Sequence, residues 1–356
     1  MPSIEIGGVE KNFLIISNYF SKKFKKVTVI TTSVDSKKKF AHNINFVSYD
    51  KINLNKLSRR LKFFFGLFLL FFEIIKNRNN LIISFQANIY CSYLCKILGT
   101  KVIIRANSAP EGWSNNFLKN IIYKHALSIA DKVVVNSQEF KKSLKKKFNI
   151  DAICIYNPLD KTNIIKNSKK KINLPFFKKK FVNFINVARF ADQKNHKILL
   201  KAFLKLKNKI NFRLLLIGEG KNETKIKNFI KSNNLENNVL IMKNIKNPYP
   251  FIKKSEVFIL SSSYEGLPNV LLEAIVLNKF IISSKCPTGP AEILDNGKGG
   301  LLFKLDSSDD LAKKIIFYVN NKKKFDYKKN FAKKRIYRFD FNSNLKEYLD
   351  LINNIK

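Results

Sequence analysis

Short apolar runs alternate with longer amphipathic segments along the chain, and this pattern predicts strands and helices in turn. In the first half, strands are expected at Val27–Thr31, Phe46–Ser48, Leu81–Phe85, Lys101–Ile104, Lys132–Val135 and Ile153–Ile155. Helices are expected between them at Val9–Phe24, Leu54–Lys76, Asn88–Leu98, Leu118–Ala130 and Glu139–Phe148. Strands that alternate with helices form parallel sheets covered by helices, so the first half is predicted to be an α/β domain.

The same alternation begins again in the second half. Strands are expected at Phe181–Val187, Arg213–Ile217, Val239–Met242, Phe258–Leu260, Phe280–Ile282 and Leu301–Phe303. Helices are expected at His196–Leu206 and Glu223–Ser232, after Asn247, after Pro268, and at Ser308–Val319, Tyr327–Ile336 and Asn342–Ile355. The pattern therefore predicts an α/β chain of two units, each with a parallel sheet flanked by helices.

A lysine-rich segment separates the two halves. Residues 161–180 contain eight lysines and no acidic residue, a composition typical of a solvated linker. We expect a first domain over residues 1–160, this linker, and a second domain over residues 181–337. Residues 338–356 are expected to form a C-terminal helix that packs back on the first domain.

The N-terminus begins with a glycine loop at a point where a strand is normally found. Residues 4–11 read IEIGGVEK, which predicts a loop that leads into the first helix. In βαβ units such a loop follows a strand, so we expect the first strand of the N-terminal domain to be missing. The alternative is that Pro2–Ile6 is itself a short edge strand.

Residues 258–303 contain a strand, a loop and a helix with two carboxylates at fixed spacing. Pro268 suits the first position of the helix, where a missing N–H is tolerated. Free backbone N–H groups at such a helix start, near Asn269–Leu271, form an anion site. Glu265 lies in the loop and Glu273 in the helix, with seven residues between them, so both can face one ligand.

Two cations follow the first strand of the second domain, Arg189 and Lys194, at a spacing of five. Arginine can grip phosphate oxygens bidentately and lysine adds a point charge. Carboxylates such as Glu265 and Glu273 accept hydrogen bonds from hydroxyl groups. Together the four residues indicate a ligand with both a diphosphate and hydroxyl groups, such as a nucleoside diphosphate joined to a sugar.

The net charge of +41 indicates nucleic acid, an anionic membrane or a phosphorylated ligand as partner. The alternative is a base-composition bias, since Lys, Asn, Ile and Phe are abundant together. A non-enzymatic nucleic-acid binder is the least favoured function, because the sequence has no aromatic–basic RNA motif and no DNA-recognition helix pattern. Four cysteines without a C-x-x-C pair, and three histidines, argue against a zinc site and are typical of reduced thiols in the cytosol.

The apolar run Phe63–Phe72 is ten residues long, whereas a membrane-spanning helix needs about 20. Two interpretations of its helix stay open. One is a core helix buried against a sheet, and the other is a helix in the membrane interface with Arg59, Arg60 and Lys62 on lipid phosphates. Because Met1–Glu10 is polar, it does not match a signal peptide, and a cytoplasmic protein on the inner face of the plasma membrane is expected.

The chain resembles the family 4 retaining glycosyltransferases of GT-B architecture, in which two Rossmann-like domains face each other across a cleft. The matching motifs are VARFADQKNHKILLKAF, LLLIGEG, NPYPFIKKSEVFILSSSYEGLPNVLLEA and CPTGPAEIL. The last motif is similar to that of the polysaccharide and glycolipid branch. The resemblance is strongest over residues 181–303, and in the first half it rests on MPSIEIGGVEK, ADKVVVNSQEF and IYNPLD.

The resemblance implies a role for each matched residue of the second half. Arg189 and Lys194 would bind the donor diphosphate and stabilise the leaving group. Glu265 would hold hydroxyl groups of the transferred sugar, and Glu273 would hold the ribose. The loop and helix start expected to wrap the donor comprise Gly266, Leu267, Pro268, Asn269, Val270 and Leu271.

On the N-terminal side of the cleft, the resemblance implies roles for two glycines and two polar residues. Gly7 and Gly8 would let the first loop approach donor and acceptor. Many relatives carry a histidine after the strand that matches Lys101–Ile104, and here Arg105 or Asn107 would contact the sugar instead.

The resemblance implies a retaining hexosyltransferase that moves a hexose or N-acetylhexosamine from a nucleotide sugar, with UDP as the expected carrier. The expected acceptor is a lipid-linked saccharide in surface polysaccharide, lipopolysaccharide or glycolipid assembly, at an anionic membrane surface. No cofactor and no metal are expected, because fixed cations and helix dipoles supply the charge. A transferase with a soluble acceptor, or an epimerase of the same fold, is the alternative.

Overall fold

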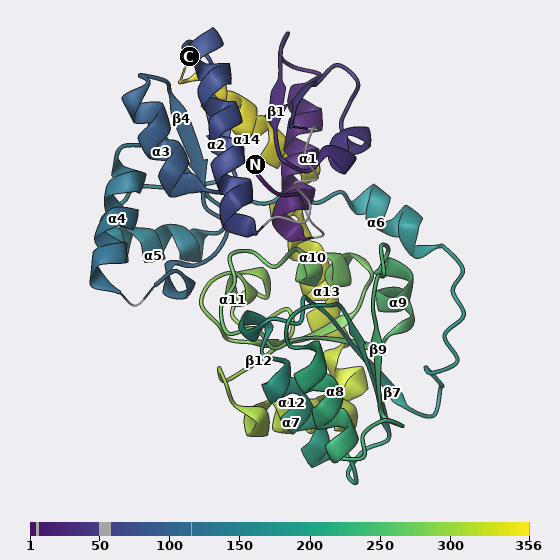
Figure 1. The fold of residues 1–356 in the computed structure, drawn as a ribbon. Coiled ribbons are helices and arrows are strands. Elements are labelled where there is room, and N and C mark those ends of the chain that lie inside the picture. Colours follow the sequence, from purple (N-terminus) through teal and green to yellow (C-terminus); the bar gives the residue numbers. More distant parts are fainter. Residues whose placement is uncertain (5–6, 50–57, 115, 356) are drawn as a thin grey trace. The chain divides into compact units, whose positions relative to one another are not determined.

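The structure, a computed structural model, describes residues 1–4, 7–49, 58–114 and 116–355 and divides into two compact units (Figure 1). Unit 1 comprises Met1–Pro158 and Phe341–Lys356, and unit 2 comprises Leu159–Asp340. The C-terminal helix therefore belongs to unit 1 although it follows unit 2 in the chain. Both units are built on parallel strands with connecting helices, as the alternating pattern predicts.

Unit 1 has its strands in two separate parallel sheets, one of β1 and β2 and one in the order β3-β4-β5-β6. The strands are β1 (Thr28–Ile30), β2 (Asn45–Val47), β3 (Ile82–Ser84), β4 (Val102–Arg105), β5 (Lys132–Val135) and β6 (Ile153–Cys154). The helices are α1 (Gly8–Phe20), α2 (Arg59–Lys76), α3 (Asn88–Ile97), α4 (Phe117–Ser128), α5 (Gln138–Phe148) and α14 (Phe341–Asn353).

Two apolar cores of unit 1 lie on opposite faces of β4, whose successive side chains point to opposite sides. Val102 and Ile104 join a core with α2, α3, α4 and α5. Ile103 joins a core with α1 and α14. The strand is buried along its whole length, which explains its continuous apolar sequence.

The N-terminal residues lie between the carboxyl ends of β1 and β3. The Met1 amino group donates to Ile30 O over 2.9 Å, and the Ser3 N–H donates to Gln86 Oε1 over 3.3 Å. In the described residues no ladder joins β1 to β3. The alternative edge strand, Pro2–Ile6, runs into residues outside the described part.

Unit 2 contains one parallel sheet in the order β12-β11-β10-β7-β8-β9. The strands are β7 (Val182–Val187), β8 (Phe212–Ile217), β9 (Val239–Met242), β10 (Val257–Leu260), β11 (Phe280–Ser284) and β12 (Leu301–Phe303). The helices are α6 (Lys161–Ser168), α7 (His196–Leu206), α8 (Glu223–Ser232), α9 (Tyr249–Lys254), α10 (Asn269–Val276), α11 (Pro290–Ile293), α12 (Ser308–Asn320) and α13 (Asp326–Arg335).

The sheet of unit 2 separates two helical layers. Helices α7, α8 and α12 share one core with the strands, and α7 packs against both α8 and α12. Helices α6, α9, α10 and α13 pack on one another elsewhere in the unit. The first and last residues of the unit are paired, since Leu159 N–H donates to Phe339 O over 3.1 Å and Leu159 forms a parallel bridge with Asp340.

Three expected boundaries differ from the structure. The first helix ends at Phe20 rather than Phe24, and α10 begins at Asn269 with Pro268 as its cap. The expected linker 161–180 starts as helix α6, which packs on α9 and α10. The Ile164 side chain of α6 is fully buried. This apolar contact attaches the start of the lysine-rich segment to unit 2, although its lysine content alone predicts a solvated linker.

The phenylalanine-rich helix α2 combines features of both interpretations of its sequence. Leu70 and Ile74 are buried in the core of unit 1, whereas Phe64, Phe68 and Phe72 are 45 to 64% exposed. The predicted start of this helix, Leu54, lies outside the described residues, and Ser58 caps α2 through its side chain. Among the described residues, none of the helices is long and apolar enough to cross a membrane.

Candidate functional site

The sheet of unit 2 has a switch point between β7 and β10, its two central strands. From β7 the chain continues outward to β8 and β9, and it then returns to β10 and continues the other way to β11 and β12. Loops on either side of such a point diverge and leave a crevice at the carboxyl ends of the strands, where ligands bind in open α/β sheets. The residues after β7 and β10 therefore form the candidate ligand site of unit 2.

Hydrogen bonds join the loop after β7 to the loop after β10. Ser263 N–H donates to Gln193 O, and the Gln193 side chain donates back to Tyr264 O, both over 2.8 Å. Ser261 Oγ donates to the carbonyl oxygen of Lys194 over 2.8 Å. These hydrogen bonds hold the two loops together and fix the backbone position of Lys194.

Lys194, in the loop after β7, contacts Glu265, in the loop after β10, although the sequence predicted the two residues from separate motifs. Lys194 Nζ lies 2.6 Å from Glu265 Oε1, and Ser262 Oγ donates to the same oxygen over 2.6 Å. Both side chains are largely shielded, with 17% of the lysine and 8% of the glutamate exposed. In the described part of the chain Glu265 Oε2 has no hydrogen-bond partner, so this oxygen can accept from a ligand hydroxyl.

Glu273, the second carboxylate of the spaced pair, lies in α10 and is 7% exposed. Tyr249 OH, at the start of α9, donates to Glu273 Oε1 over 3.2 Å. At the start of the same helix, Leu271 N–H is bonded to Pro268 O, so it is not open to an anion. The Val270 N–H has no acceptor among the described residues, so it is open to a ligand.

A third loop, between β11 and α11, closes on the loop that carries Glu265. Glu265 N–H donates to Pro287 O over 2.9 Å, and Thr288 Oγ1 donates to Glu265 O over 2.8 Å. Gly289 has a φ of +91°, and a Cβ there would lie 2.4 Å from Gly266 O. Only glycine fits this approach, which explains the glycine of the CPTGPAEIL motif.

Arg189 lies just beyond the end of β7 and is exposed. Within the described residues its guanidinium has neither a hydrogen bond nor an ion pair. It is therefore the strong cation near the switch point that stays available for an anion, whereas Lys194 is already shared with Glu265.

His196 follows the two cations but is a structural residue. Its Nε2 lies 3.1 Å from Asn186 Oδ1, and Asn186 Nδ2 donates to Ile259 O over 2.8 Å, so it helps to hold α7, β7 and β10 together. Burial, and then the charge of Lys194, lower its pKa to about 4. The imidazole is thus neutral near pH 7 and cannot supply a proton there.

The residues predicted in the first half lie in unit 1. Gly7 caps α1 and Gly8 begins it. Arg105 is fully buried, and its guanidinium donates to Tyr348, Asn107 and Asn157 and lies over a phenylalanine ring.

The expected contact of Arg105 with a sugar does not fit this position, because the guanidinium has no exposed surface. The Asn107 side chain is also occupied, since it accepts from Arg105 and donates to Phe85 O over 2.8 Å. Together these bonds tie the end of β4 to α14.

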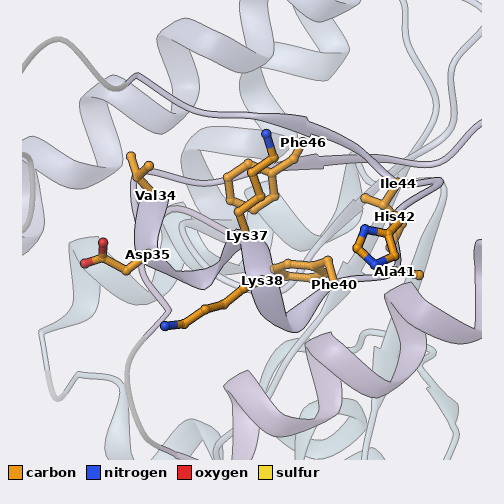
Figure 2. Close-up of a pocket in the computed structure, with 9 residues that line it drawn as sticks. All are labelled: Val34, Asp35, Lys37, Lys38, Phe40, Ala41, His42, Ile44 and Phe46. Carbon is orange, nitrogen blue, oxygen red and sulfur yellow. The ribbon is translucent and has the colours of Figure 1, made fainter.

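A cavity of about 550 Å³ opens in unit 1 beside β2. Figure 2 shows its lining, which comprises Val34, Asp35, Lys37, Lys38, Phe40, Ala41, His42, Ile44 and Phe46. None of the residues that the sequence motifs single out belongs to this lining. The cavity therefore adds a mixed basic and apolar surface that the motifs do not indicate.

Three site residues were missed by sequence reasoning, namely Tyr249, Ser262 and Thr288. Tyr249 lies in a matched motif, NPYP, but its link to Glu273 depends on how α9 meets α10. Ser262 and Thr288 both hold the loop of Glu265. Serines and threonines in loops are too common for any sequence signal to distinguish these two.

Two protein-family models together match most of the chain. Residues 6–163 match the model "Glycosyltransferase Family 4", and residues 166–335 match the model "Glycosyl transferases group 1". An uncharacterized glycosyltransferase of Methanocaldococcus jannaschii is 37% identical over 208 residues, which cover 55% of this chain and 50% of that protein. The chain thus spans about half the length of this relative.

Two further proteins match the chain over nearly its full length. The GalNAc-alpha-(1->4)-GalNAc-alpha-(1->3)-diNAcBac-PP-undecaprenol alpha-1,4-N-acetyl-D-galactosaminyltransferase of Campylobacter jejuni is 25% identical over 373 residues, covering 100% of this chain and 98% of that protein. The crystal structure of Anabaena HepE in complex with UDP-glucose has a TM-score of 0.79 at 16% identity, covering 99% of this chain and 98% of that one. This likeness shows the shared GT-B fold.

Proposed function

The chain belongs to the family 4 glycosyltransferases, and from this premise we propose that it acts in polysaccharide or glycolipid biosynthesis, where it transfers a hexose or N-acetylhexosamine from a nucleoside diphosphate sugar to a lipid-linked saccharide. The observation that carries the proposal is the contact between Lys194, after β7, and Glu265, after β10, at the switch point of unit 2. A cation and a carboxylate at this place match a diphosphate joined to a sugar.

Each charged group of the site has one task in this proposal. Arg189, which is open to solvent, grips the diphosphate bidentately, and Lys194 shares its three N–H donors between Glu265 and the same phosphate. Glu265 Oε2 accepts from a hydroxyl group of the transferred sugar. Glu273, held by Tyr249, accepts from the ribose hydroxyls, and UDP is the proposed carrier.

The transfer itself needs charge stabilisation on the leaving group. We propose retention: the bond from the sugar C1 to the phosphate oxygen breaks, and a bond from C1 to the acceptor oxygen forms on the same face. The acceptor proton passes to the departing phosphate oxygen, and Arg189 and Lys194 stabilise the negative charge as it develops. With two fixed cations and the Val270 N–H in place, the proposed mechanism requires no divalent metal.

The lipid-linked acceptor rests on similarity. The Campylobacter relative that covers the whole chain is named for an undecaprenol-linked acceptor. A lipid-linked acceptor requires the enzyme to work at a membrane surface, so we propose a cytoplasmic protein bound peripherally to the inner face of the plasma membrane. The exposed phenylalanine row of α2 and the net charge of +41 support this position.

A donor screen that detects release of the nucleoside diphosphate tests the proposal. With the preferred donor and a lipid-linked saccharide, Glu273→Ala is expected to lower kcat/KM at least 100-fold, on the order of 3 kcal/mol of transition-state binding. Glu236→Ala, at an exposed carboxylate of the same unit, is the matched control and should match wild type. Equal release by Glu273→Ala and wild type would contradict the assignment, and an epimerised sugar without release would favour the epimerase alternative.

A further inference from the structure

Thr288, in the loop between β11 and α11, has a strained backbone. Its φ is +43°, in the left-handed region. Ten non-glycine residues of the described chain have a positive φ, and eight of them are asparagine or aspartate, which tolerate this region best. Thr288 is the only β-branched residue among the ten. Residues strained in this way persist only where neighbouring contacts hold them, and they concentrate at functional sites.

The contacts that hold Thr288 come from the loop that carries Glu265. The Thr288 side chain is buried, and its hydroxyl oxygen lies 2.8 Å from Glu265 O and 3.2 Å from Gly266 O. Its single O–H is therefore shared between two carbonyl oxygens. The preceding residue, Pro287, accepts from the Glu265 N–H over 2.9 Å. One turn thus binds both the backbone N–H and the backbone carbonyl oxygen of Glu265.

These bonds complete the fixation of Glu265. Its Oε1 is held by Lys194 Nζ and by Ser262 Oγ, each over 2.6 Å. The backbone of Ser262 is itself fixed, because Ser284 Oγ, at the end of β11, donates to Ser262 O over 2.6 Å. Every other polar atom of Glu265 has a protein partner, so Oε2 alone is left for a ligand among the described residues. A carboxylate fixed in this way needs no reorganisation when a ligand binds.

The shape of the turn does not explain why residue 288 is a threonine. Glycine adopts a positive φ without strain, and asparagine does so with little strain. Neither residue has a hydroxyl group. The strained threonine is therefore explained by the hydrogen bonds of its O–H to the loop of Glu265.

We propose that Thr288 is a positioning residue for the transfer reaction. Its hydroxyl group fixes the backbone of Glu265, so that Oε2 stays oriented toward the hydroxyl groups of the donor sugar. Thr288 does not touch the donor and acts through Glu265. The inference rests on the proposed function, because it assigns the consequence of this contact to the proposed role of Glu265.

The kinetic test separates the hydroxyl group from the backbone strain. Thr288→Gly removes the O–H and relieves the strain, so the variant is expected to fold, and its kcat should fall roughly 10- to 100-fold. Thr288→Ser keeps the O–H and should retain most of the wild-type kcat. Affinity for the nucleoside diphosphate alone, measured by calorimetry, should be unchanged in both variants, since Arg189 and Glu273 bind it in the proposed site. Thermal unfolding by circular dichroism verifies that each variant folds.

The matched control is Asn296→Gly, at another left-handed residue of unit 2. Asn296 has a φ of +52° and is exposed. In the part of the chain that the structure describes, its side chain has no hydrogen bond to the loop of Glu265. This exchange relieves backbone strain without removing a contact to Glu265, so kcat should match wild type.

Hydrogen exchange followed by NMR tests the contact without any donor. The Glu265 N–H, which is bonded to Pro287 O, should exchange about tenfold faster in Thr288→Gly than in wild type. In Thr288→Ser and in Asn296→Gly it should exchange at the wild-type rate. Because no turnover is needed, this measurement decides whether Thr288 holds Glu265 even if the proposed function fails.

Several results would overturn the proposal. One is a Thr288→Gly variant with wild-type kcat or with unchanged exchange at Glu265, and another is a Thr288→Ser variant as slow as Thr288→Gly. A parallel loss of kcat and of nucleoside diphosphate affinity in Thr288→Gly would make Thr288 a structural residue of the whole site. A wild type that releases no nucleoside diphosphate from any donor sugar would instead contradict the proposed function.

Discussion

Acidification is expected to destabilise unit 2 through His196. Its pKa is lowered from the ordinary value of 6.5 to about 4, chiefly by burial and also by the charge of Lys194. As the pH falls the unfolded chain binds the proton first, so stability present above pH 6.5 is lost between about 6.5 and 4. Each pH unit in that window costs about 1.4 kcal/mol, so unfolding requires about 2 kcal/mol less at pH 5 than at pH 7.

Two measurements check this expectation on the full chain. The protein has three histidines, so His196→Asn identifies the proton NMR resonance of His196 by its disappearance, and the wild-type resonance should titrate with a midpoint near pH 4. Urea unfolding followed by circular dichroism should show a smaller loss of stability from pH 7 to pH 5 in the variant, by about 2 kcal/mol. A midpoint near 6.5, or equal losses in both proteins, would refute the reasoning.

Three further substitutions test the contacts described above. Tyr249→Phe removes the hydroxyl that donates to Glu273, so we expect the donor KM to rise roughly tenfold with kcat unchanged, and an unaltered KM in the release assay would count against this contact. Gly289→Ala places a Cβ 2.4 Å from a carbonyl oxygen at a φ of +91° and should cost about 3 kcal/mol of stability, whereas an unchanged melting temperature would disprove the steric argument. Tyr348→Phe leaves Arg105 Nε without its acceptor and should lower the free energy of urea unfolding by about 2 kcal/mol, an effect that a wild-type denaturation midpoint would exclude.

The sequence was a good guide to the strands of unit 2 and to the residues at their ends. Strands such as β10 are buried along their whole length, so they appear as unbroken apolar runs. The contact between Lys194 and Glu265 did not follow from the pattern alone, because it depends on β7 and β10 being neighbours although two strands separate them in the chain. The roles of Lys194, Glu265 and Glu273 remain predictions for the experiments above.

The sequence was a poor guide to unit 1. Arg105 follows an apolar strand, the usual place of a ligand contact, yet its acceptor Tyr348 lies 243 positions away in α14, beyond the reach of any local pattern. The segment Phe117–Ser128 reads as a helix, but its composition does not say which apolar side chains pack inward and which stay exposed. Such distinctions depend on tertiary contacts rather than on periodicity.

The pairing of Leu159 with Asp340 makes unit 2 a cassette whose two ends meet. A segment of this kind can be produced alone or moved into another host chain with short joints, since its termini need not be stretched apart. Residues 159–340 carry Arg189, Lys194, Glu265 and Glu273 together. If the proposed roles hold, exchange of this cassette between related chains combines one set of donor contacts with a new acceptor side, which is a modular route to new glycosidic linkages.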